Sequence, residues 1–227
     1  MPSTHAEFEC KLKFNALMSP DPQDHSKEER LSRIVAASLE VFAEFSFQDA
    51  TTGEIARRAR VSKRDIYAHF PNKHALLIGT MNDVLRTNDD NIVKAIAHTE
   101  CLPSLPKRLV VIGFTLINEV LSLEMSVMLR LVTSESINQP LIGAVFFENG
   151  PARRAKLISE VLSMHTADPD TPVTDIFQAA EHYLALVTYQ PRLSTLVGMR
   201  DMWDFASIQT HVESAVECFL RAHAEFA

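Results

Sequence analysis

The sequence predicts an all-α fold, and three observations lead to this prediction. Apolar residues recur at the three- and four-residue spacing of amphipathic helices along most of the chain. No segment alternates between apolar and polar residues for long enough to predict a sheet. Pairs of a hydroxyl residue and an acid, at the spacing of a capping box, start several of the helical stretches. The chain has 227 residues, 46% of them hydrophobic, and is therefore long enough to bury a substantial core.

Residues 1–25 are expected to form a mobile arm, because the segment ends in the proline-containing polar stretch SPDPQDH. Its Lys11 and Lys13 are not followed by the apolar run of a signal sequence. Ser26 and Glu29 then have the spacing of a capping box and predict the start of the first helix. The apolar stripe of this helix consists of Leu31, Ile34, Val35, Leu39, Phe42 and Phe45.

Residues 51–70 predict two short helices joined by a tight turn. Each helix starts with a hydroxyl residue that is followed by an acid, namely Thr51 with Glu54 and Ser62 with Asp65. The inward-facing apolar positions are Ile55, Ala56, Ala59, Val61, Ile66 and Phe70. This pattern indicates a helix-turn-helix, a motif whose second helix enters the major groove of DNA.

The second of these helices has a predicted DNA-reading face. At about 100° per residue, its buried side is set by Ile66 and Phe70. The opposite side carries Arg64, Asp65 and Ala68. In a major groove, arginine can pair with guanine, an acid can accept from cytosine, and a small residue permits close approach to a thymine methyl. The alternative is an ordinary solvated amphipathic helix whose charges contact no DNA.

Other residues flank this face, namely Lys63, Tyr67 and His69. Lys63 and Tyr67 are expected to contact phosphates on the groove wall, which positions a helix without reading sequence. Beyond them, Asn72 can cap the next helix, and Lys73 lies in its first turn, where a cation can meet phosphate.

Residues 30–77 resemble the DNA-binding domain of the TetR family of bacterial transcriptional repressors. The matching positions are Ile34, Ala36, Ala37, Phe42, Thr51, Thr52, Ile55, Ala56, Val61, Ser62, Tyr67, Phe70, Lys73 and Leu76. The candidate DNA-binding residues are therefore Thr51, Thr52, Ser62, Lys63, Arg64, Asp65, Tyr67, Ala68, His69 and Lys73. Two residues, Ser46 and Arg60, stand where the family usually has glycine, which suits a left-handed helix end. The family also often has a small residue and threonine at Arg64 and Asp65, so a relative's operator sequence cannot be assumed.

The net charge of −7 is unevenly distributed along the chain. Residues 27–73 carry 9 cations and 7 acids, whereas residues 74–227 carry 11 cations and 18 acids. Binding to DNA depends on the local field at the phosphates rather than on the total charge. The distribution is therefore compatible with a DNA-binding domain joined to an acidic second domain.

The remainder of the chain predicts a long linking helix followed by further helices. Breaks are expected at Asn138 to Pro140, at Gly150–Pro151, in the loop MHTADPDTP and in the stretch from Gln190–Pro191 to Gly198. Residues 109–132 are apolar almost all round and predict buried helices. A membrane span is the alternative, but four residues interrupt the run, namely Asn118, Glu119, Glu124 and Arg130.

An effector pocket is expected among the buried helices, because methionines and aromatic rings there can form an adaptable apolar lining. The candidate lining residues are Phe114, Met125, Met128, Phe146, Phe147 and His182. Each of them taken singly fits the plain core equally well, and His182 can also be a core or interface histidine.

The last two predicted helices, within residues 171–190 and 203–224, combine apolar stripes with small residues. The candidate dimer-interface residues are Phe177, Ala180, Leu184, Val212, Val216 and Phe219. Packing within one chain is the alternative, and the resemblance to a family that dimerises through its last two helices favours the dimer. The segment FFENGPARRAKLISEVL also resembles the C-terminal domain of the AefR-like TetR subgroup.

The sequence contains no metal-ligand spacing and no nucleophile or phosphate-binding motif, so neither an enzyme nor a cofactor is expected. Its three cysteines, Cys10, Cys101 and Cys218, form no disulfide or metal pattern and are expected to be reduced. The predicted organisation is an arm (1–25), a helix-turn-helix DNA-binding domain (26–73) and a helical effector-binding and dimerisation domain (74–227).

The predicted function is that of a cytoplasmic, homodimeric, ligand-responsive regulator with no membrane partner. The simplest version is a repressor that binds a palindromic double-stranded DNA operator and is released by a small apolar or aromatic effector. The alternative is a small-molecule-binding or enzymatic helical protein with a vestigial DNA-binding domain.

Overall fold

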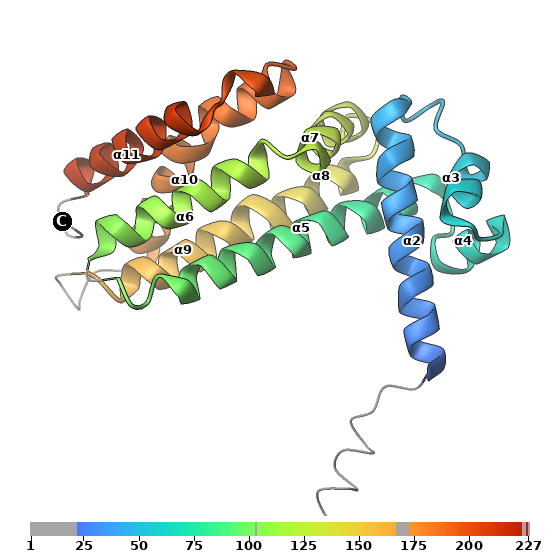
Figure 1. The fold of residues 1–227 in the computed structure, drawn as a ribbon, viewed down its shortest axis with the longest axis horizontal. Helices are drawn as coiled ribbons and strands as arrows, with labels where there is room; N and C mark the ends of the chain where they lie inside the picture. The colour runs from blue at the N-terminus through green and yellow to red at the C-terminus, as the bar shows by residue number, and fades with distance from the viewer. Residues whose placement is uncertain (1–21, 103, 167–172, 224–225, 227) are drawn as a thin grey trace, which may run out of the picture.

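The computed structural model describes residues 22–102, 104–166, 173–223 and 226, and every regular element in these residues is helical, which confirms the all-α prediction. Figure 1 shows a small group of helices at one end of the molecule and a larger helical bundle at the other. The α-helices are α2 (Pro22–Glu44), α3 (Thr52–Ala59), α4 (Lys63–His69), α5 (Lys73–His98), α6 (Leu105–Val120), α7 (Leu123–Glu135), α8 (Pro140–Phe147), α9 (Arg153–Ser163), α10 (Val173–Leu196) and α11 (Phe205–Ala222). A π-helical turn, η1 (Glu148–Ala152), joins α8 to α9, and a 3-10 turn, η2 (Arg200–Met202), precedes α11.

The first helix begins earlier than the sequence indicated. It starts at Pro22, whose fixed φ and missing N–H suit a first helical position. Ser26 therefore lies inside α2 rather than capping it, and residues 22–25 belong to the helix rather than to the arm. Residues 1–21 of the arm, with Lys11 and Lys13, lie outside the described residues.

The helix α5 connects the two ends of the molecule, running from the group formed by α2, α3 and α4 into the larger bundle (Figure 1). One continuous apolar core joins the small group to the near end of the bundle. This core includes Phe42 and Ile66 beside Met81 of α5, Met128 of α7 and Ile142 of α8. Because α7 and α8 share this close-packed core with α2, α3 and α4, a displacement of α7 or α8 would also displace side chains of the small group.

A second apolar core fills the far end of the bundle, between α6, α9, α10 and α11. Tyr183 is fully buried there, and its hydroxyl donates to the carbonyl of Leu109 at 2.6 Å. Gly113 lets α6 approach α11 closely, since a Cβ at this position would lie 2.8 Å from Cγ1 of Val212. A larger residue at 113 would therefore force the two helices apart.

The chain stays helical through Gly150–Pro151, where a break was expected. The break expected between Gln190 and Gly198 comes only after Leu196, because the chain also stays helical through Pro191. The break expected at Asn138 to Pro140 is found between α7 and α8. Gly150 and Pro151 lie in the π-helical turn η1, and Pro191 lies inside α10. A proline leaves the carbonyl four residues earlier without its helical donor. In α10 that carbonyl belongs to Val187, and Nε2 of His211 on α11 donates to it at 2.9 Å. A tertiary hydrogen bond thus compensates for the proline.

Among the described residues, no single helix is long and apolar enough to cross a membrane. The pair α6 and α7 passes by length and composition only when taken together, and the two helices are bent by 64° at the break between them.

Candidate DNA-binding surface and effector cavity

The turn between α3 and α4 is built by local hydrogen bonds that the sequence pattern predicts. Oγ1 of Thr51 accepts from the backbone N–H of Glu54 at 3.1 Å, which caps α3. Ser62 and Asp65 form a complete capping box at the start of α4. Arg60 ends α3 with φ 55° and ψ 45°, the left-handed conformation that favours glycine. A side chain in this conformation costs roughly 1 kcal/mol.

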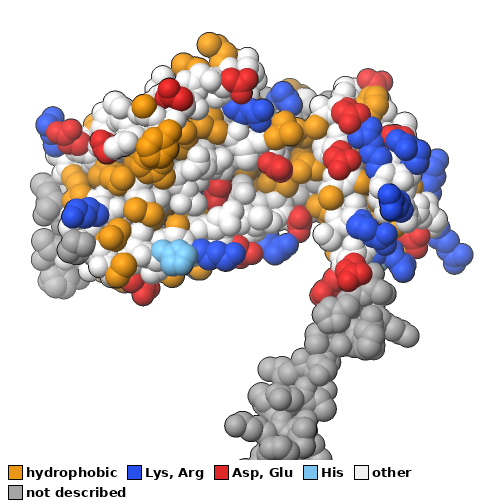
Figure 2. Space-filling model, in the orientation of Figure 1, with side chains coloured by type: hydrophobic (Ala, Val, Ile, Leu, Met, Phe, Trp, Pro, Cys, Tyr) orange, Lys and Arg blue, Asp and Glu red, His pale blue; other side chains and the backbone are white. Residues whose placement is uncertain are grey.

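The outer face of α4 is exposed, as predicted, at Arg64, Ala68, Lys63 and Tyr67. Figure 2 shows lysine and arginine side chains gathered at the end of the molecule that α3 and α4 occupy. The hydroxyl of Tyr67 lies 3.2 Å from that of Thr52, so the two helices place these polar groups side by side. Such a convex, basic face with adjoining hydroxyls can contact the phosphates and base edges of one groove.

The positive field of this face comes from only some of its cations. Arg57 and Arg58 both donate to the carboxylate of Glu54, and Arg58 also binds Glu44 with an N–O distance of 2.6 Å. The hydrogen bonds from Arg57 and Arg58 lower the pKa of Glu54 to about 2. Other cations, namely Arg60, Lys63 and Arg64, form no ion pair within the described part of the chain and remain available to phosphates.

Two predicted DNA contacts have local partners instead. The carboxylate of Asp65 accepts from the N–H and hydroxyl of Ser62 at 2.9 and 2.6 Å and lies 3.4 Å from Arg30. These hydrogen bonds from Ser62 hold the pKa of Asp65 below its usual value. Oδ2 of Asp65 is thus engaged in starting α4 and Oδ1 in the contact with Arg30, and cytosine would have to displace these partners.

The ammonium group of Lys73 donates to the carbonyls of Ala50 and Gln48 at 2.7 and 3.1 Å and lies 4.5 Å from the ring centroid of Phe47. It therefore ties the start of α5 to the loop before α3, whereas a phosphate contact was expected. His69 is half-buried against Phe70, with the two rings edge-on at 6.5 Å. The side chain of His69 is therefore less exposed on the outer face of α4 than the helical geometry predicted.

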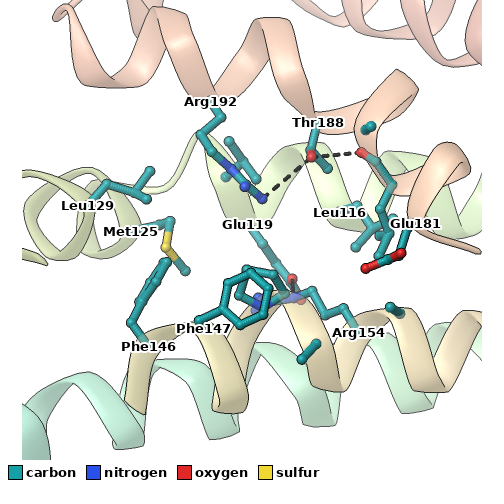
Figure 3. Close-up of a pocket in the computed structure, with 16 residues that line it drawn as sticks. Leu116, Glu119, Met125, Leu129, Phe146, Phe147, Arg154, Glu181, Thr188 and Arg192 are labelled. Atoms are coloured by element: carbon teal, nitrogen blue, oxygen red, sulfur yellow. Dashed lines mark hydrogen bonds and ion pairs between the residues drawn. The ribbon is translucent and has the colours of Figure 1, made fainter. Parts of the chain in front are cut away.

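A cavity of about 190 Å³ lies in the bundle between α6, α7, α8, α9 and α10 (Figure 3). Three predicted pocket residues line it, namely Met125, Phe146 and Phe147. The other three lie elsewhere. Met128 is fully buried in the core shared with the α2–α4 group, Phe114 stacks on Phe205 at 5.8 Å, and exposed His182 lies 3.0 Å from Nε2 of His223.

Charged groups also line this cavity, and the sequence pattern did not predict them there. Glu119 comes from α6, Arg154 from α9, and both Glu181 and Arg192 from α10. The side chains of Glu119 and Arg154 are 7% and 9% exposed and lie 3.7 Å apart. Burial raises the pKa of Glu119 to about 8, against the lowering effect of Arg154 and with support from Asp89. In the sequence, the signal that could have pointed to this charged group was Glu119, an acid within an otherwise apolar stretch.

The comparisons with known proteins agree with this architecture. Residues 34–79 match the family described as bacterial regulatory proteins of the tetR family. Residues 107–225, more than half of the chain, match the C-terminal domain of AefR-like transcriptional repressors. The chain belongs to the TetR family. It is a TetR-family transcriptional regulator with an N-terminal DNA-binding domain and an AefR-like C-terminal domain, as the resemblance implied.

Curated relatives of this TetR-family regulator match over part of their length. HbdR, an HTH-type transcriptional regulator of Aromatoleum sp. (strain CIB), is 36% identical over 69 residues, which cover 30% of each chain. An uncharacterized HTH-type transcriptional regulator of Mycobacterium tuberculosis is 28% identical over 91 residues, 40% of this chain and 47% of the relative. The matched stretches thus span less than half of these relatives.

Solved structures match over most of the chain. A putative TetR-family regulator from Mesorhizobium loti has a TM-score of 0.76 at 20% identity, covering 86% of this chain and 97% of that one. The flavonoid-responsive regulator FrrA has a TM-score of 0.63 at 22% identity, with 85% and 96% covered. FadR, a fatty acid degradation regulator from Bacillus halodurans, has a TM-score of 0.65 at 16% identity, with 84% and 94% covered. These likenesses support the fold.

Regulators of the TetR family form dimers. The candidate interface residues of this chain differ in how deeply they are buried. Four of them, namely Ala180, Val212, Val216 and Phe219, are buried in the core of a single chain, while Phe177 and Leu184 are half-buried. The stripes on α10 and α11 thus serve packing within one chain. The large apolar side chains that α10 leaves exposed are Tyr189 and Leu193, and exposed Val197 follows in the turn directly after the helix.

No cluster of His, Cys, Asp and Glu that could hold a metal ion occurs among the residues that the structure describes. Cys101 and Cys218 are exposed and free, and Cys10 lies outside the described residues.

Proposed function

We propose that this TetR-family regulator binds a palindromic operator as a homodimer and is released from it by a small effector held in the cavity of the bundle. The observation that carries this proposal is that the cavity adjoins the apolar core of the DNA-binding domain. Met125 and Leu129 of α7 line the cavity and also belong to the core that contains Phe42 and Ile66. An effector that displaces α7 therefore acts on the helices that carry the DNA-binding face.

A second connection runs from the cavity wall to α5. The segment formed by η1 and α9 contributes Pro151, Ala152 and Arg154 to the cavity. The same segment holds α5 through two polar contacts, Arg153 with Asp89 at 2.6 Å and Asn149 with Asn82 at 3.0 Å. Because α5 starts at the DNA-binding domain, a shift of this segment changes the separation of the two recognition helices in a dimer. Occupancy of the cavity and affinity for the operator are then linked reciprocally.

The exposed apolar side chains of α10 supply the proposed dimer surface. Tyr189 and Leu193 are four residues apart and therefore lie on one side of the helix, and exposed Val197 follows in the turn after it. Half-buried Leu186 lies on α10 just before them. A second copy of the chain is the proposed occupant, because members of the family dimerise and a two-fold contact places two DNA-binding domains on one frame. A cytoplasmic location follows from the proposed contact with DNA.

The names of two structural neighbours agree with a small-molecule effector. FrrA is described as flavonoid-responsive and FadR as a fatty acid degradation regulator. Both neighbours share the fold of this chain at low identity, so neither name identifies its effector.

The test is an operator-shift assay with the DNA upstream of the coding sequence and with sites selected from a random duplex library. The purified protein is expected to retain a palindromic site at an ionic strength of about 0.15 M. Arg64→Gln should weaken that site by about 1–3 kcal/mol and relax preference at one base position. Arg130→Gln, an exposed substitution on α7, is the matched control and should bind normally. If no duplex is retained sequence-specifically, the proposal fails and a ligand-binding protein with a vestigial DNA-binding domain is the better description.

A further inference from the structure

The effector cavity combines an apolar lining with four charged side chains, namely buried Glu119 and Arg154, half-buried Arg192 and exposed Glu181. Its apolar wall includes six residues from α6, α7 and α8, namely Leu116, Val120, Met125, Leu129, Phe146 and Phe147. Within this wall lie two guanidinium groups, those of Arg154 and Arg192, which α9 and α10 contribute from different sides (Figure 3). A buried cation without a partner is costly, so the question is what neutralises these two groups.

Arg192 has no acidic partner among the described residues. Its only hydrogen bond within them is a 3.4 Å contact from Nη2 to the hydroxyl of Thr188, one turn earlier on α10. Burial lowers the pKa of Arg192, and the charge of Arg154 lowers it further. Figure 3 shows the guanidinium of Arg192 pointing into the cavity, toward the side that Arg154 and Phe147 occupy. The two cations thus face a common space.

Arg154 has one acidic neighbour, and its contact with that neighbour is incomplete. Its Nε lies 3.7 Å from Oε2 of Glu119, beyond hydrogen-bond distance. Both carboxylate oxygens of Glu119 and Nη2 of Arg154 are buried without a hydrogen-bond partner. Two other acids lie nearby. Asp89 is paired with Arg153 at 2.6 Å. Glu181 lines the cavity but is exposed, and it forms no ion pair with Arg154 or Arg192 within the described part of the chain. Glu119 and Arg154, which both line the cavity, therefore retain hydrogen-bond acceptors and a donor without partners.

We propose that the effector of this regulator is a small apolar molecule with one carboxylate, which the guanidinium groups of Arg192 and Arg154 bind together. A carboxylate accepts two parallel hydrogen bonds from a guanidinium, and two arginines can satisfy both of its oxygens. The apolar part of the molecule then lies against Phe146, Phe147 and Met125. This inference rests on the proposed function, since it takes the cavity as the effector site.

The state of Glu119 supports an anionic ligand. Because burial raises its pKa to about 8, Glu119 is largely protonated at neutral pH and does not repel a carboxylate. In that form its O–H can donate to the ligand, and Glu119 does not neutralise Arg154. The bound carboxylate would supply the missing charge.

The volume of the cavity sets the size of the apolar part. An apolar cavity of about 150 Å³ is large enough for benzene. The 190 Å³ found here thus fits one aromatic ring with a short acidic substituent, or an alkyl chain of similar volume.

The test measures binding of matched probes to the full-length protein by calorimetry, without DNA. The probes are phenylacetate, benzoate and hexanoate, each compared with its uncharged primary amide, and phenyl phosphate distinguishes a carboxylate site from a general anion site. At least one carboxylate should bind about tenfold or more tightly than its amide, which corresponds to about 1.4 kcal/mol. Equal binding of acids and amides, or no binding of any acid at millimolar concentration, overturns the proposal. Tighter binding of phenyl phosphate than of every carboxylate also overturns the assignment of the head group.

Variants then locate the site. Arg192→Gln should remove the preference for the carboxylate over the amide, while the matched control Arg130→Gln on the exposed side of α7 should keep it. In the parent, affinity for the carboxylate should fall as pH rises through about 8, because Glu119 ionises beside the ligand. Glu119→Gln should abolish this pH dependence. Retention of the full acid-over-amide preference by Arg192→Gln means that the carboxylate binds elsewhere, and the proposal is then wrong.

An operator-shift assay with the same probe separates this inference from the function on which it rests. If a carboxylate binds through Arg192 but leaves operator affinity unchanged at saturation, the ligand class stands and effector-controlled release fails. If an amide or another neutral compound releases the operator while the carboxylates do not bind, release stands and the ligand class fails.

Discussion

Arg153 at the start of α9 and Asp89 in the middle of α5 form an ion pair with an N–O distance of 2.6 Å. The carboxylate of Asp89 is buried and the guanidinium of Arg153 is largely exposed. Arg153 directly precedes Arg154, whose side chain lines the effector cavity. The pair thus joins the wall of the cavity to the helix that leads to the DNA-binding domain, and its strength bears on how well the two sites communicate.

Breaking this pair from its exposed side should weaken communication without removing either site. Arg153→Gln should leave ligand affinity nearly unchanged, yet lower the coupling free energy between ligand and operator by about 1 kcal/mol. The measurement is operator affinity with and without saturating ligand. Lys156→Gln, an exposed change one turn later on α9, is the control and should keep the full coupling. An unaltered coupling in Arg153→Gln would show that the effect passes through α7 and the shared core instead.

Glu119 should make the stability of the protein depend on pH. Its pKa is about 8 in the folded chain, against an ordinary value of 4.5 for an exposed glutamate, so between these values the folded state holds a proton that the unfolded state has released. The free energy of unfolding therefore falls as pH rises from about 5 to about 8. Glu119→Gln should remove this part of the slope and be more stable than the parent by at least about 1 kcal/mol near pH 8.

Urea unfolding at several pH values measures this effect. A smaller slope of the same sign should remain in the Glu119→Gln variant, because burial also raises the pKa of Asp89. Parallel pH profiles for parent and variant would contradict the assignment of a protonated Glu119.

Features that depend on neighbouring residues could be predicted from the sequence, and features that depend on distant ones could not. The capping of α4 by Ser62 and Asp65 needs only adjacent positions and was found as predicted. The continuation of α10 through Pro191 depends on His211, which lies on another helix and donates to the freed carbonyl. No local pattern around a proline carries that information.

The same dependence on distant residues explains why the candidate site could be predicted only in part from the sequence. The apolar wall was partly foreseen, since Met125, Phe146 and Phe147 belong to short apolar stretches that must be buried somewhere. The charged group formed by Glu119, Arg154 and Arg192 brings together three helices, and only the folded chain shows that these residues meet. Spacing along the chain gives no measure of their distance.

Lys73 and Lys63 should behave differently when their charges are removed. Lys73→Met keeps the side-chain stem but loses the hydrogen bonds to the carbonyls of Ala50 and Gln48, so it should destabilise the protein by about 1–3 kcal/mol. Its operator binding at a temperature where it is folded should keep the parent's salt dependence.

Lys63→Gln removes an exposed cation at the start of α4 and should have the opposite profile. Its melting temperature should stay close to that of the parent, while the slope of log affinity against log salt should decrease by about one unit. Thermal melts and a salt titration of operator binding check both variants together. A reduced salt slope for Lys73→Met would show that its ammonium group leaves the carbonyls to bind phosphate.

The dimer surface can be tested by comparing a charge on the outside of α10 with one inside the bundle. Leu193→Glu places a carboxylate on the exposed stripe and should dissociate the dimer while leaving the monomer folded, because an interface core disfavours an unpaired charge. Operator affinity should then fall by about a hundredfold or more, since two linked DNA-binding domains gain from their effective concentration.

The contrasting variant is Val216→Glu, whose side chain would enter the core between α6, α10 and α11. Burial of an unpaired charge there should unfold the C-terminal domain rather than only separate the subunits. Light scattering gives the oligomeric state and circular dichroism the helical content. Leu193→Glu should be a helical monomer at micromolar concentration, whereas Val216→Glu should lose helical signal. A Leu193→Glu protein that stays dimeric would place the interface on another face, such as that of α11, and leave the exposed stripe of α10 without this role.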